Sequence, residues 1–551
     1  MARLLLPILL AAAAAPAVAQ PHDGHAAGPP QTLAQWADGA RLFDGLGGFH
    51  RPVTTRSGEA QLYFDQGMRF VWAFNHDEAT RSFAKAAALD PSCAACWWGV
   101  ALTLGPNYNM PMMAEARARA GWEALQRAKA AAAGASPVER ALIDALAARF
   151  LADRPLDPSN SAAPLKAYVA AMRAVADRFP DDMDVRTLYA EALMNTNPWK
   201  LWKPDGSPGP GTPDILAALR KVLARDPRHP GANHYWIHAV EASPDPGQAL
   251  ASAEMLTGMM PAAGHLEHMP AHIFQRVGRY EAAAEANRKG AAADLAYLGQ
   301  TAPPDYYPMY LIHNFQFLAA SAAMEGRRAE TIDALRRARA AVPDAMLLAM
   351  PGLDWSVGYL YDGYVRFGLW QEMLAEPAPD PNLPGLTAAW LQARATALAA
   401  TGQVAAAEAA VAALDRLVAA TPADATQGQN AARPLYEIGA LRAKARIASA
   451  RGDKARAVAL LTEAVAREDK LAYNEPEDAF FPGRHLLGAA LLDAGRAAEA
   501  KAVYLEDLKR HPGNGWAYAG LWRARGGRAG PDGRIGKAFE KSDVHPTASA
   551  Y

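Results

Sequence analysis

The sequence holds very little that would tie a fold together covalently. Among 551 residues there are two cysteines, Cys93 and Cys96, which is too few for a scaffold held by several disulfide bonds. Aromatic residues make up only 8% of the chain, whereas hydrophobic residues make up 51%. Much of that apolar content is alanine, which favours close-packed helices over sheets. Packing between helices must therefore supply the stability of the fold.

An excess of one charge and long apolar stretches are also missing. The formal net charge is −1, so the composition does not indicate nucleic acid or an anionic membrane as a partner. Beyond the first residues, no stretch reaches the roughly 18 uninterrupted apolar residues that a membrane-spanning helix needs. The sequence contains no Gly-rich phosphate loop, nucleophile elbow or HExxH motif. We therefore expect no membrane span and no nucleic-acid partner.

The amino terminus has the features of a secretory signal peptide. Arg3 gives a positive start, Leu4–Ala15 is apolar, and Ala17–Ala19 is a small-residue cleavage site. We expect residues 1–19 to be removed and the mature protein to be periplasmic or secreted. Residues 20–56, rich in Pro, Gly, Ala and His, are expected to form a flexible N-terminal segment.

One pattern recurs along residues 57–525. A helix with a small residue near its middle is followed by a turn at glycine, and a second helix with alanine and an aromatic residue ends at Asp-Pro or a similar breaker. Each unit is about 34 residues long, and Phe64–Cys93 and Arg484–Asn514 show the pattern most clearly. The positions that carry it are the small residues Gly67, Ala271 and Gly488, the turn residues Gly278, Gly326 and Gly495, and the pairs Ala79 with Phe83 and Ala500 with Tyr504.

These features resemble the tetratricopeptide repeat. The resemblance implies an all-α fold, a superhelical solenoid of helix hairpins over residues 57–525, followed by a C-terminal tail at 526–551. The segment Met194–Thr212 interrupts the array and is expected to be a long ordered loop. The phrases "NHYWIHAVEAS" and "GHLEHMPAHI" are similar to those of an exported bacterial group of such proteins, whose activity is unassigned.

Histidines gather near the middle of the array. In tetratricopeptide repeats the first helix of each hairpin lines a concave groove, so the resemblance implies which residues face it. Counting from the turn glycines, or from the closing Pro230, places seven residues on or beside groove positions of three consecutive hairpins: His234, His238, Glu241, His265, His268, His272 and His313. Helical geometry supports this independently, because offsets of 0, 3 and 7 or 0, 4 and 7 residues fall within roughly a 60° arc. His485 takes a groove position in a later hairpin.

These seven residues predict a transition-metal site. Imidazole is the commonest metal ligand, and facing helices that each give two or three side chains build mono- and dinuclear centres. The set suits copper, zinc or iron, with Glu241 as a ligand or a general base. A helix that began at Pro270 would, however, leave His265 and His268 in the preceding loop and outside the shared arc.

Three functions fit these observations. The first is an exported binding protein whose histidine-lined groove holds a transition-metal ion. The second is a metal-dependent enzyme that uses the same cluster, with Glu241 as the base. The third is a metal-free scaffold whose groove binds a protein, a peptide or a small molecule. The fold alone selects none of them, because repeat folds of this kind mostly serve recognition.

Two further motifs receive structural interpretations. The CxxC pair lacks the histidine of a haem-attachment motif and lies between helices, so we expect two packed thiols or a local disulfide bond. The segment "NEPEDAFFPGRH" has three carboxylates, Glu475, Glu477 and Asp478. We interpret it as a solvated loop between hairpins.

Overall fold

The computed structural model describes residues 30–301, 303, 307–349, 352–527, 533–544, 546 and 548–551. The expected signal peptide at 1–19 and the start of the 20–56 segment lie outside the described residues. Within them the chain is mostly helical, as expected. Two short strands, β1 (Thr426–Gln427) and β2 (Asn430–Ala431), pair in antiparallel fashion.

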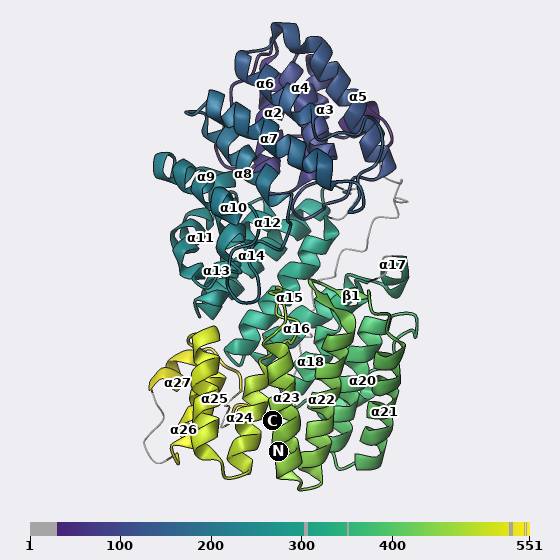
Figure 1. Cartoon of the computed structure of the whole chain (residues 1–551), viewed down its shortest axis with the longest axis vertical. Coiled ribbons are helices and arrows are strands. Elements are labelled where there is room, and N and C mark those ends of the chain that lie inside the picture. The colour runs from purple at the N-terminus through teal and green to yellow at the C-terminus, as the bar shows by residue number, and fades with distance from the viewer. Residues whose placement is uncertain are drawn as a thin grey trace, which may run out of the picture.

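The first half of the chain forms helix hairpins that end in the histidine-rich region (Figure 1). Its elements are α1 (Leu33–Ala37), α2 (Gly58–Trp72), α3 (His76–Leu89), α4 (Ala94–Leu104), α5 (Glu115–Ala131), η1 (Ala132–Gly134), α6 (Pro137–Ala147), α7 (Ala162–Arg178), α8 (Met183–Met194), α9 (Thr212–Arg225), α10 (Pro230–Val240), η2 (Pro246–Ala249), α11 (Leu250–Leu256), α12 (Gly264–His268), α13 (Pro270–Arg276) and α14 (Tyr280–Leu298).

The second half continues the stack. Its elements are α15 (Pro308–Met324), α16 (Arg328–Ala340), α17 (Asp344–Ala349), η3 (Asp354–Val357), α18 (Tyr359–Arg366), α19 (Trp370–Ala375), α20 (Pro384–Ala400), α21 (Val404–Ala420), α22 (Ala432–Ala450), α23 (Lys454–Glu468), α24 (Gly483–Asp493), α25 (Ala497–Arg510), α26 (Gly515–Ala524) and α27 (Gly533–Ala538). Figure 1 shows the molecule as an elongated array, with α2–α7 at one end and α20–α27 at the other.

The repeat features read from the sequence are confirmed. The turn glycines Gly278, Gly326 and Gly495 have φ of 77°, 71° and 76°, a left-handed conformation that glycine adopts without strain. Within the α2/α3 hairpin, a Cβ on Gly67 would lie 2.5 Å from the ring of Phe83. The small residue of the first helix therefore makes room for the aromatic residue of the second. The chain is a tetratricopeptide-like solenoid, and residues 195–211 form the expected loop between α8 and α9.

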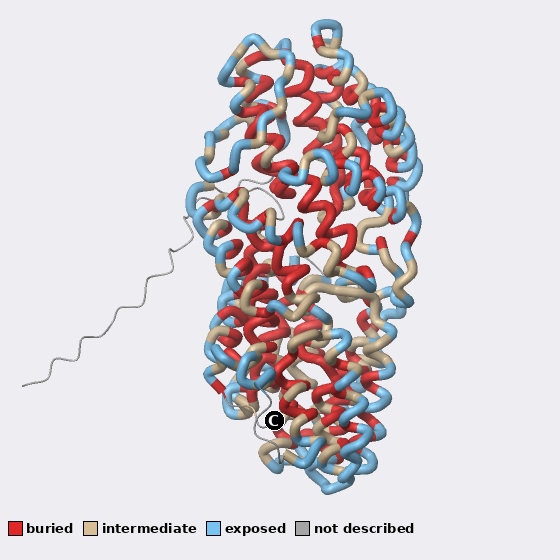
Figure 2. Tube along the Cα trace, turned by 90° about the vertical axis from the view of Figure 1, so that its left-hand side faces the viewer, coloured by how far each residue is buried: buried red, intermediate tan, exposed pale blue. Residues whose placement is uncertain are grey.

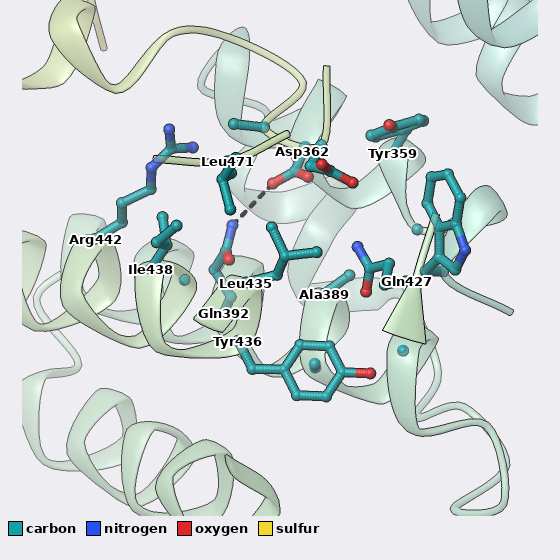
Figure 3. A pocket seen from close by; sticks show the side chains of 17 residues that line it. Tyr359, Asp362, Ala389, Gln392, Gln427, Leu435, Tyr436, Ile438, Arg442 and Leu471 are labelled. Carbon is teal, nitrogen blue, oxygen red and sulfur yellow. Dashed lines mark hydrogen bonds between the residues drawn. The ribbon is translucent and has the colours of Figure 1, made fainter. Parts of the chain in front are cut away.

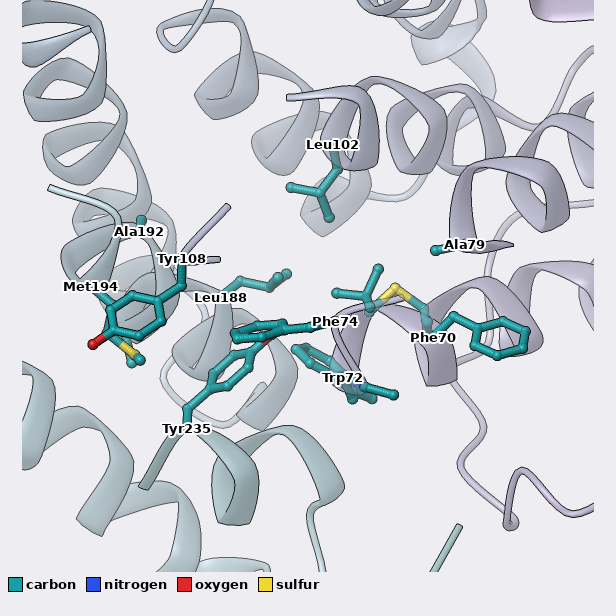
Figure 4. Packing of buried hydrophobic residues seen from close by; sticks show 14 of the residues in the cluster. Phe70, Trp72, Phe74, Ala79, Leu102, Tyr108, Leu188, Ala192, Met194 and Tyr235 are labelled. Atoms are coloured by element: carbon teal, nitrogen blue, oxygen red, sulfur yellow. The ribbon is translucent and has the colours of Figure 1, made fainter. Parts of the chain in front are cut away.

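A continuous buried layer runs through the stack (Figure 2). In the N-terminal half, the largest cluster joins α2, α4, α8 and α10 through rings such as Phe70, Trp72, Phe74 and Tyr235, seen together in Figure 4. Each of these side chains is at most 2% exposed. This aromatic packing fixes α2 against α10, which carries two of the histidines.

Residues 30–56 differ from the flexible segment expected of them. Trp36 of α1 is fully buried, and the guanidinium of Arg51 pairs with Asp182 and Asp184 at 2.9 and 2.6 Å. The backbone amide of Phe43 donates to a side chain of α2. A Pro- and Gly-rich composition predicts a flexible segment and does not reveal these few anchoring side chains. They hold the described part of the segment on the solenoid.

The C-terminal tail also packs against the array. The hydroxyl of Tyr504 and that of Ser549 are hydrogen-bonded at 2.6 Å, and the buried Arg366 donates to the backbone carbonyl of Ser549. The ring of Tyr551 lies 6.1 Å from that of Trp516. None of the described helices combines the length and apolarity required to cross a bilayer.

Candidate metal centre

The seven predicted residues converge on one buried region. His234 and His238 come from α10, with Glu241 directly after it; His265 and His268 come from α12, His272 from α13 and His313 from α15. The ligand atoms form two sets of three histidines, and within each set they lie within 4.8 Å of one another. We call His234, His238 and His265 the first triad, and His268, His272 and His313 the second triad.

A glycine sets the position of α10. Pro230 starts the helix and His229 caps it, its Nδ1 accepting from the backbone amide of Ala232 at 3.0 Å. Directly after Pro230, Gly231 lies against the indole ring of Trp72, and any Cβ there would collide with that ring. Because α10 approaches α2 so closely, the Nδ1–H of His234 donates to the backbone carbonyl of Trp72 at 2.6 Å.

The proline in the middle of the histidine segment does not disrupt the cluster. Met269, between α12 and α13, keeps helical dihedral angles of φ −51° and ψ −36°, so Pro270 starts a new helix without a loop before it. His265, His268 and His272 therefore share a face, as the periodicity predicts. The face divides, however: His265 joins the first triad, and His268 and His272 join the second.

The first triad presents free nitrogen atoms to one another. The Nδ1–H of His238 donates to Oε1 of Glu241 at 3.0 Å. The Nε2 atoms of His234 and His238, and both ring nitrogens of His265, have no hydrogen-bond partner among the described residues. The ring of His265 packs between Phe74 and Tyr310, with centroids at 5.7 and 4.4 Å. All three rings are thus held in place, and one nitrogen of each lies within 4.8 Å of the others.

The second triad is more strongly hydrogen-bonded. The Nδ1–H of His268 donates to Oδ1 of Asn287 at 2.7 Å, and its Nε2 lies 2.6 Å from Nε2 of His272. The ring of His313 lies 4.7 Å from that of His268 and 5.8 Å from that of His272. A close approach of α12 to α14 positions His268, since a Cβ on Gly290 would lie 3.1 Å from the Cβ of His268.

Two carboxylates sit behind the imidazoles. Glu241 uses Oε1 for His238, and its Oε2 lies 2.7 Å from Nδ1 of His272, so one carboxylate touches a histidine of each triad. Glu475 forms an ion pair with the same Nδ1 of His272. A third group, Glu241, His272 and Glu475, also has ligand atoms within 4.8 Å of one another.

Burial controls the protonation of these rings. Burial and neighbouring histidines hold the pKa of His234, His265 and His268 well below the ordinary histidine range, and burial lowers the pKa of His238 and His313 to about 3. These five imidazoles are neutral at pH 7, the form that binds metal.

His272 is the exception among the six histidines. Burial alone would lower its pKa, but the carboxylates of Glu475 and Glu241 outweigh burial and raise it to about 10. Burial in turn raises the pKa of Glu241. In the metal-free centre a protonated His272 therefore offsets the negative charge of the carboxylates.

The surroundings differ from the open groove expected from the resemblance. Each histidine of the first triad is at most 3% exposed, as are His268 and His272. Aromatic rings and the loop that carries Glu475 enclose them. The repeat scheme identifies the inward helix face correctly, but here neighbouring elements cover that face.

The carboxylate loop also differs from its interpretation as a solvated segment. The side chain of Glu475 is only 4% exposed and meets His272, whereas that of Glu477 is 53% exposed and pairs with His511. Glu475 lies about 200 residues from the histidines in sequence, and no local pattern distinguishes it from Glu477. Asn287 and the carbonyl of Trp72 are likewise partners that the sequence does not reveal.

Other motifs lie apart from the centre. His485 is buried, with Nε2 2.9 Å from Oδ2 of Asp507 and 2.6 Å from the side-chain amide of Asn514, so it serves its own hairpin. Cys93 and Cys96 form a disulfide bond, the second of the two expected states.

Two hollows that share lining residues lie beside the centre. A cavity of ≈ 50 Å³ ends at His272 and Glu475 and is walled by Phe317 and Pro476. It adjoins a cleft of ≈ 720 Å³ that shares Arg276 with it. The cleft opens between the loops at 202–206 and 243–247 on one side and residues 468–484 on the other.

A separate cavity lies in the second half, between α18, α20 and α22 (Figure 3). There the side-chain amide of Gln392 donates to Oδ1 of Asp362 at 2.9 Å, and burial raises the pKa of Asp362 to about 6. Its lining includes none of the triad histidines.

Fold and site together define a tetratricopeptide-like helical-repeat protein with a buried histidine centre. No family model matches the sequence, and no curated protein matches it. Similar solved structures include the human IFIT1 dimer with m7Gppp-AAAA, 13% identical over 81% of this chain and 88% of that chain, with a TM-score of 0.32. The APC/C hetero-tetramer Cut9-Hcn1 is 13% identical over 88% and 87%, with a TM-score of 0.31. The P58(IPK) TPR domain is 10% identical over 89% and 100%, with a TM-score of 0.21.

Proposed function

We propose that the buried histidine centre binds a transition-metal ion, and that the protein is an exported metal-binding helical-repeat protein. The observation that carries the proposal is the first triad. Nε2 of His234 and His238 and both nitrogens of His265 are buried and without a hydrogen-bond partner among the described residues. A buried polar atom left unpaired costs about 1–3 kcal/mol. A metal ion would give all three rings a partner at once.

The atoms behind the triad support the same proposal. Nδ1 of His234 is held by a backbone carbonyl and Nδ1 of His238 by a carboxylate. Partners of these two kinds orient metal-bound histidines in proteins and fix the tautomer whose Nε2 faces the ion. Neutral imidazoles suit copper, zinc or iron, and three protein ligands leave a coordination position for another molecule.

Export is part of the proposal. The disulfide between Cys93 and Cys96 supports it, because such bonds persist in the periplasm and outside the cell and are rare in the reducing cytosol. The signal-like features of the first residues also support export.

A metal-dependent enzyme is the second candidate, and the cavity that ends at His272 favours it. A purely structural ion needs no approach from outside, whereas a reacting molecule does. The adjoining cleft of ≈ 720 Å³ is large enough for a peptide or small-molecule ligand. Substrate or partner binding there is part of this second candidate.

Metal analysis of the purified, untagged protein tests the proposal. The protein is loaded separately with copper(II), zinc(II) and iron(II), passed over a desalting column and analysed by mass spectrometry for metal per chain. We expect at least one equivalent of one of these metals in wild type, and a smaller amount in the double variant His234→Ala, His238→Ala. His50→Ala, at a side chain that is 55% exposed, is the control and keeps the wild-type amount.

Absence of metal from the loaded wild-type protein would contradict the proposal. If wild type retains none of the three metals after loading, while circular dichroism shows it to be helical, the centre is not a metal site. The histidines would then be buried packing groups of a metal-free scaffold.

A further inference from the structure

We propose that the centre holds two metal ions, one in each triad, with a small molecule of two or three atoms as a further ligand. This rests on the proposed function and specifies the number of ions and the class of ligand. The six histidines do not form one shell. Their ligand atoms separate into two sets of three, each set within 4.8 Å, and three nitrogens per ion is a common number in catalytic sites.

The two triads lie next to one another. The rings of His238 and His272 have centroids 5.9 Å apart, and so do those of His265 and His268. Both contacts join a member of the first triad to a member of the second. Ions at two such adjacent triads would be on the order of 4 Å apart, as in other two-metal sites.

The carboxylates of Glu241 and Glu475 contact the histidines at Nδ1, the ring nitrogen opposite Nε2. Glu241 places one oxygen on Nδ1 of His238 and the other on Nδ1 of His272, so it fixes one ring of each triad with Nε2 toward the ions. Glu475 adds a second partner to His272. We therefore assign both carboxylates as positioning residues for the histidines. In this assignment Glu241 is neither a metal ligand nor a base.

An ion with three protein nitrogens would keep a coordination position for a further ligand, and the space beside the triads limits what can fill it. The cavity beside the second triad measures ≈ 50 Å³ and has His272 as the one triad histidine in its lining, whereas a water molecule needs about 10–15 Å³ on the same kind of measure. Phe317 and Pro476 wall it. The ligand class is thus a small anion or a diatomic molecule, and azide is a suitable probe.

Stoichiometry is the first test. Full-length wild type is expected to bind two equivalents of copper, and His234→Ala, His238→Ala and His268→Ala, His313→Ala are each expected to bind one. His76, buried in the same core but in neither triad, provides the matched control, because His76→Ala should still bind two. One equivalent in wild type, abolished by either double variant, would overturn the two-ion assignment and leave the proposed function intact. Retention of none of copper, zinc and iron in wild type would overturn both.

Electron paramagnetic resonance of copper(II)-loaded wild type is the second test. It uses wild type alone, so it can be carried out even if a variant fails to fold. Two ions at this separation couple, so the spectrum should be strongly broadened or lose most of its intensity relative to total copper. Azide should change the spectrum and add an absorption band. A full-intensity signal from two isolated copper ions would contradict adjacent triads, and an unchanged spectrum with azide would contradict the further ligand.

Discussion

His234 donates a hydrogen bond to the backbone carbonyl of Trp72, 162 residues earlier in the chain, over 2.6 Å. This bond fixes which nitrogen of the ring carries the proton, and it turns Nε2 toward the other members of the first triad. It exists because Gly231, three residues before His234, allows α10 to rest directly on the indole ring. The geometry of the proposed metal centre therefore depends on the packing of two distant hairpins.

Replacement of Gly231 by valine tests that dependence. The added side chain would collide with Trp72 and separate α10 from α2, which should cost about 1–3 kcal/mol of stability and weaken metal binding by the first triad. Thermal unfolding and a competition titration with a chelator measure the two effects. Gly58→Ala is the control, since a Cβ at Gly58 meets nothing within 4 Å. Wild-type metal affinity in Gly231→Val would show that the Trp72 contact does not position His234.

Replacement of Glu241 by glutamine tests the shared carboxylate. The amide keeps the size of the side chain but can accept from only one ring at its oxygen, so one histidine loses its partner. Changes of this kind cost 10–100-fold in metal affinity, and we expect that range with helical content unchanged. Glu285→Gln, on the surface and paired with Arg288, is the matched control. An affinity equal to that of wild type would exclude the positioning role of Glu241.

The fold was largely predictable because its signals are local. The turn glycine Gly278 and the pair of Gly67 with Phe83 each act within one hairpin, so a 34-residue period reveals them. The grouping of the histidines was predictable for the same reason, since the periodicity of α12 and α13 places His265, His268 and His272 on one face.

The closure of the site was not predictable from such signals. Glu475 reaches His272 from a loop in the second half of the chain, and nothing near it in sequence marks that contact. The burial of the histidines depends on rings such as Phe74 and Tyr310 that come from other hairpins. The division into two triads follows from where α10 and α15 approach α12, which is a property of the superhelix and not of any repeat.

The buried Asp294 predicts a pH dependence of stability. Burial raises its pKa to about 7, although the hydroxyl of Tyr307 donates to it at 2.7 Å and lowers the pKa somewhat. The native state thus holds this proton more tightly than the unfolded chain, whose aspartates ionise near pH 4. The contribution is present at low pH and is lost as the pH rises from about 4 to 7.

Denaturation midpoints of wild type and Asp294→Asn between pH 5 and pH 8 check this effect. Wild type should lose stability over that interval by more than the variant does, because one pKa unit corresponds to about 1.4 kcal/mol. Asp333→Asn, at a side chain that is 69% exposed, should follow wild type. Parallel curves for wild type and Asp294→Asn would contradict the assignment.

The disulfide between Cys93 and Cys96 should stabilise the fold only modestly, because it closes a very short loop and removes little entropy from the unfolded chain. We expect Cys93→Ser, Cys96→Ser to fold, to melt a few degrees lower than wild type and to bind the same amount of metal. Intact mass before and after alkylation reports whether the bond forms in the purified protein. Loss of metal binding in this variant would place the disulfide within the site, against the structure.

The central claim is that imidazole nitrogens of the two triads bind metal, and anomalous diffraction from crystals of the copper- or zinc-loaded protein tests it most directly. The account predicts anomalous peaks about 2.0–2.1 Å from Nε2 of His234 and His238 and from nitrogens of the second triad. Peaks found only at surface histidines such as His50, with both triads retaining the hydrogen bonds described above, would contradict it.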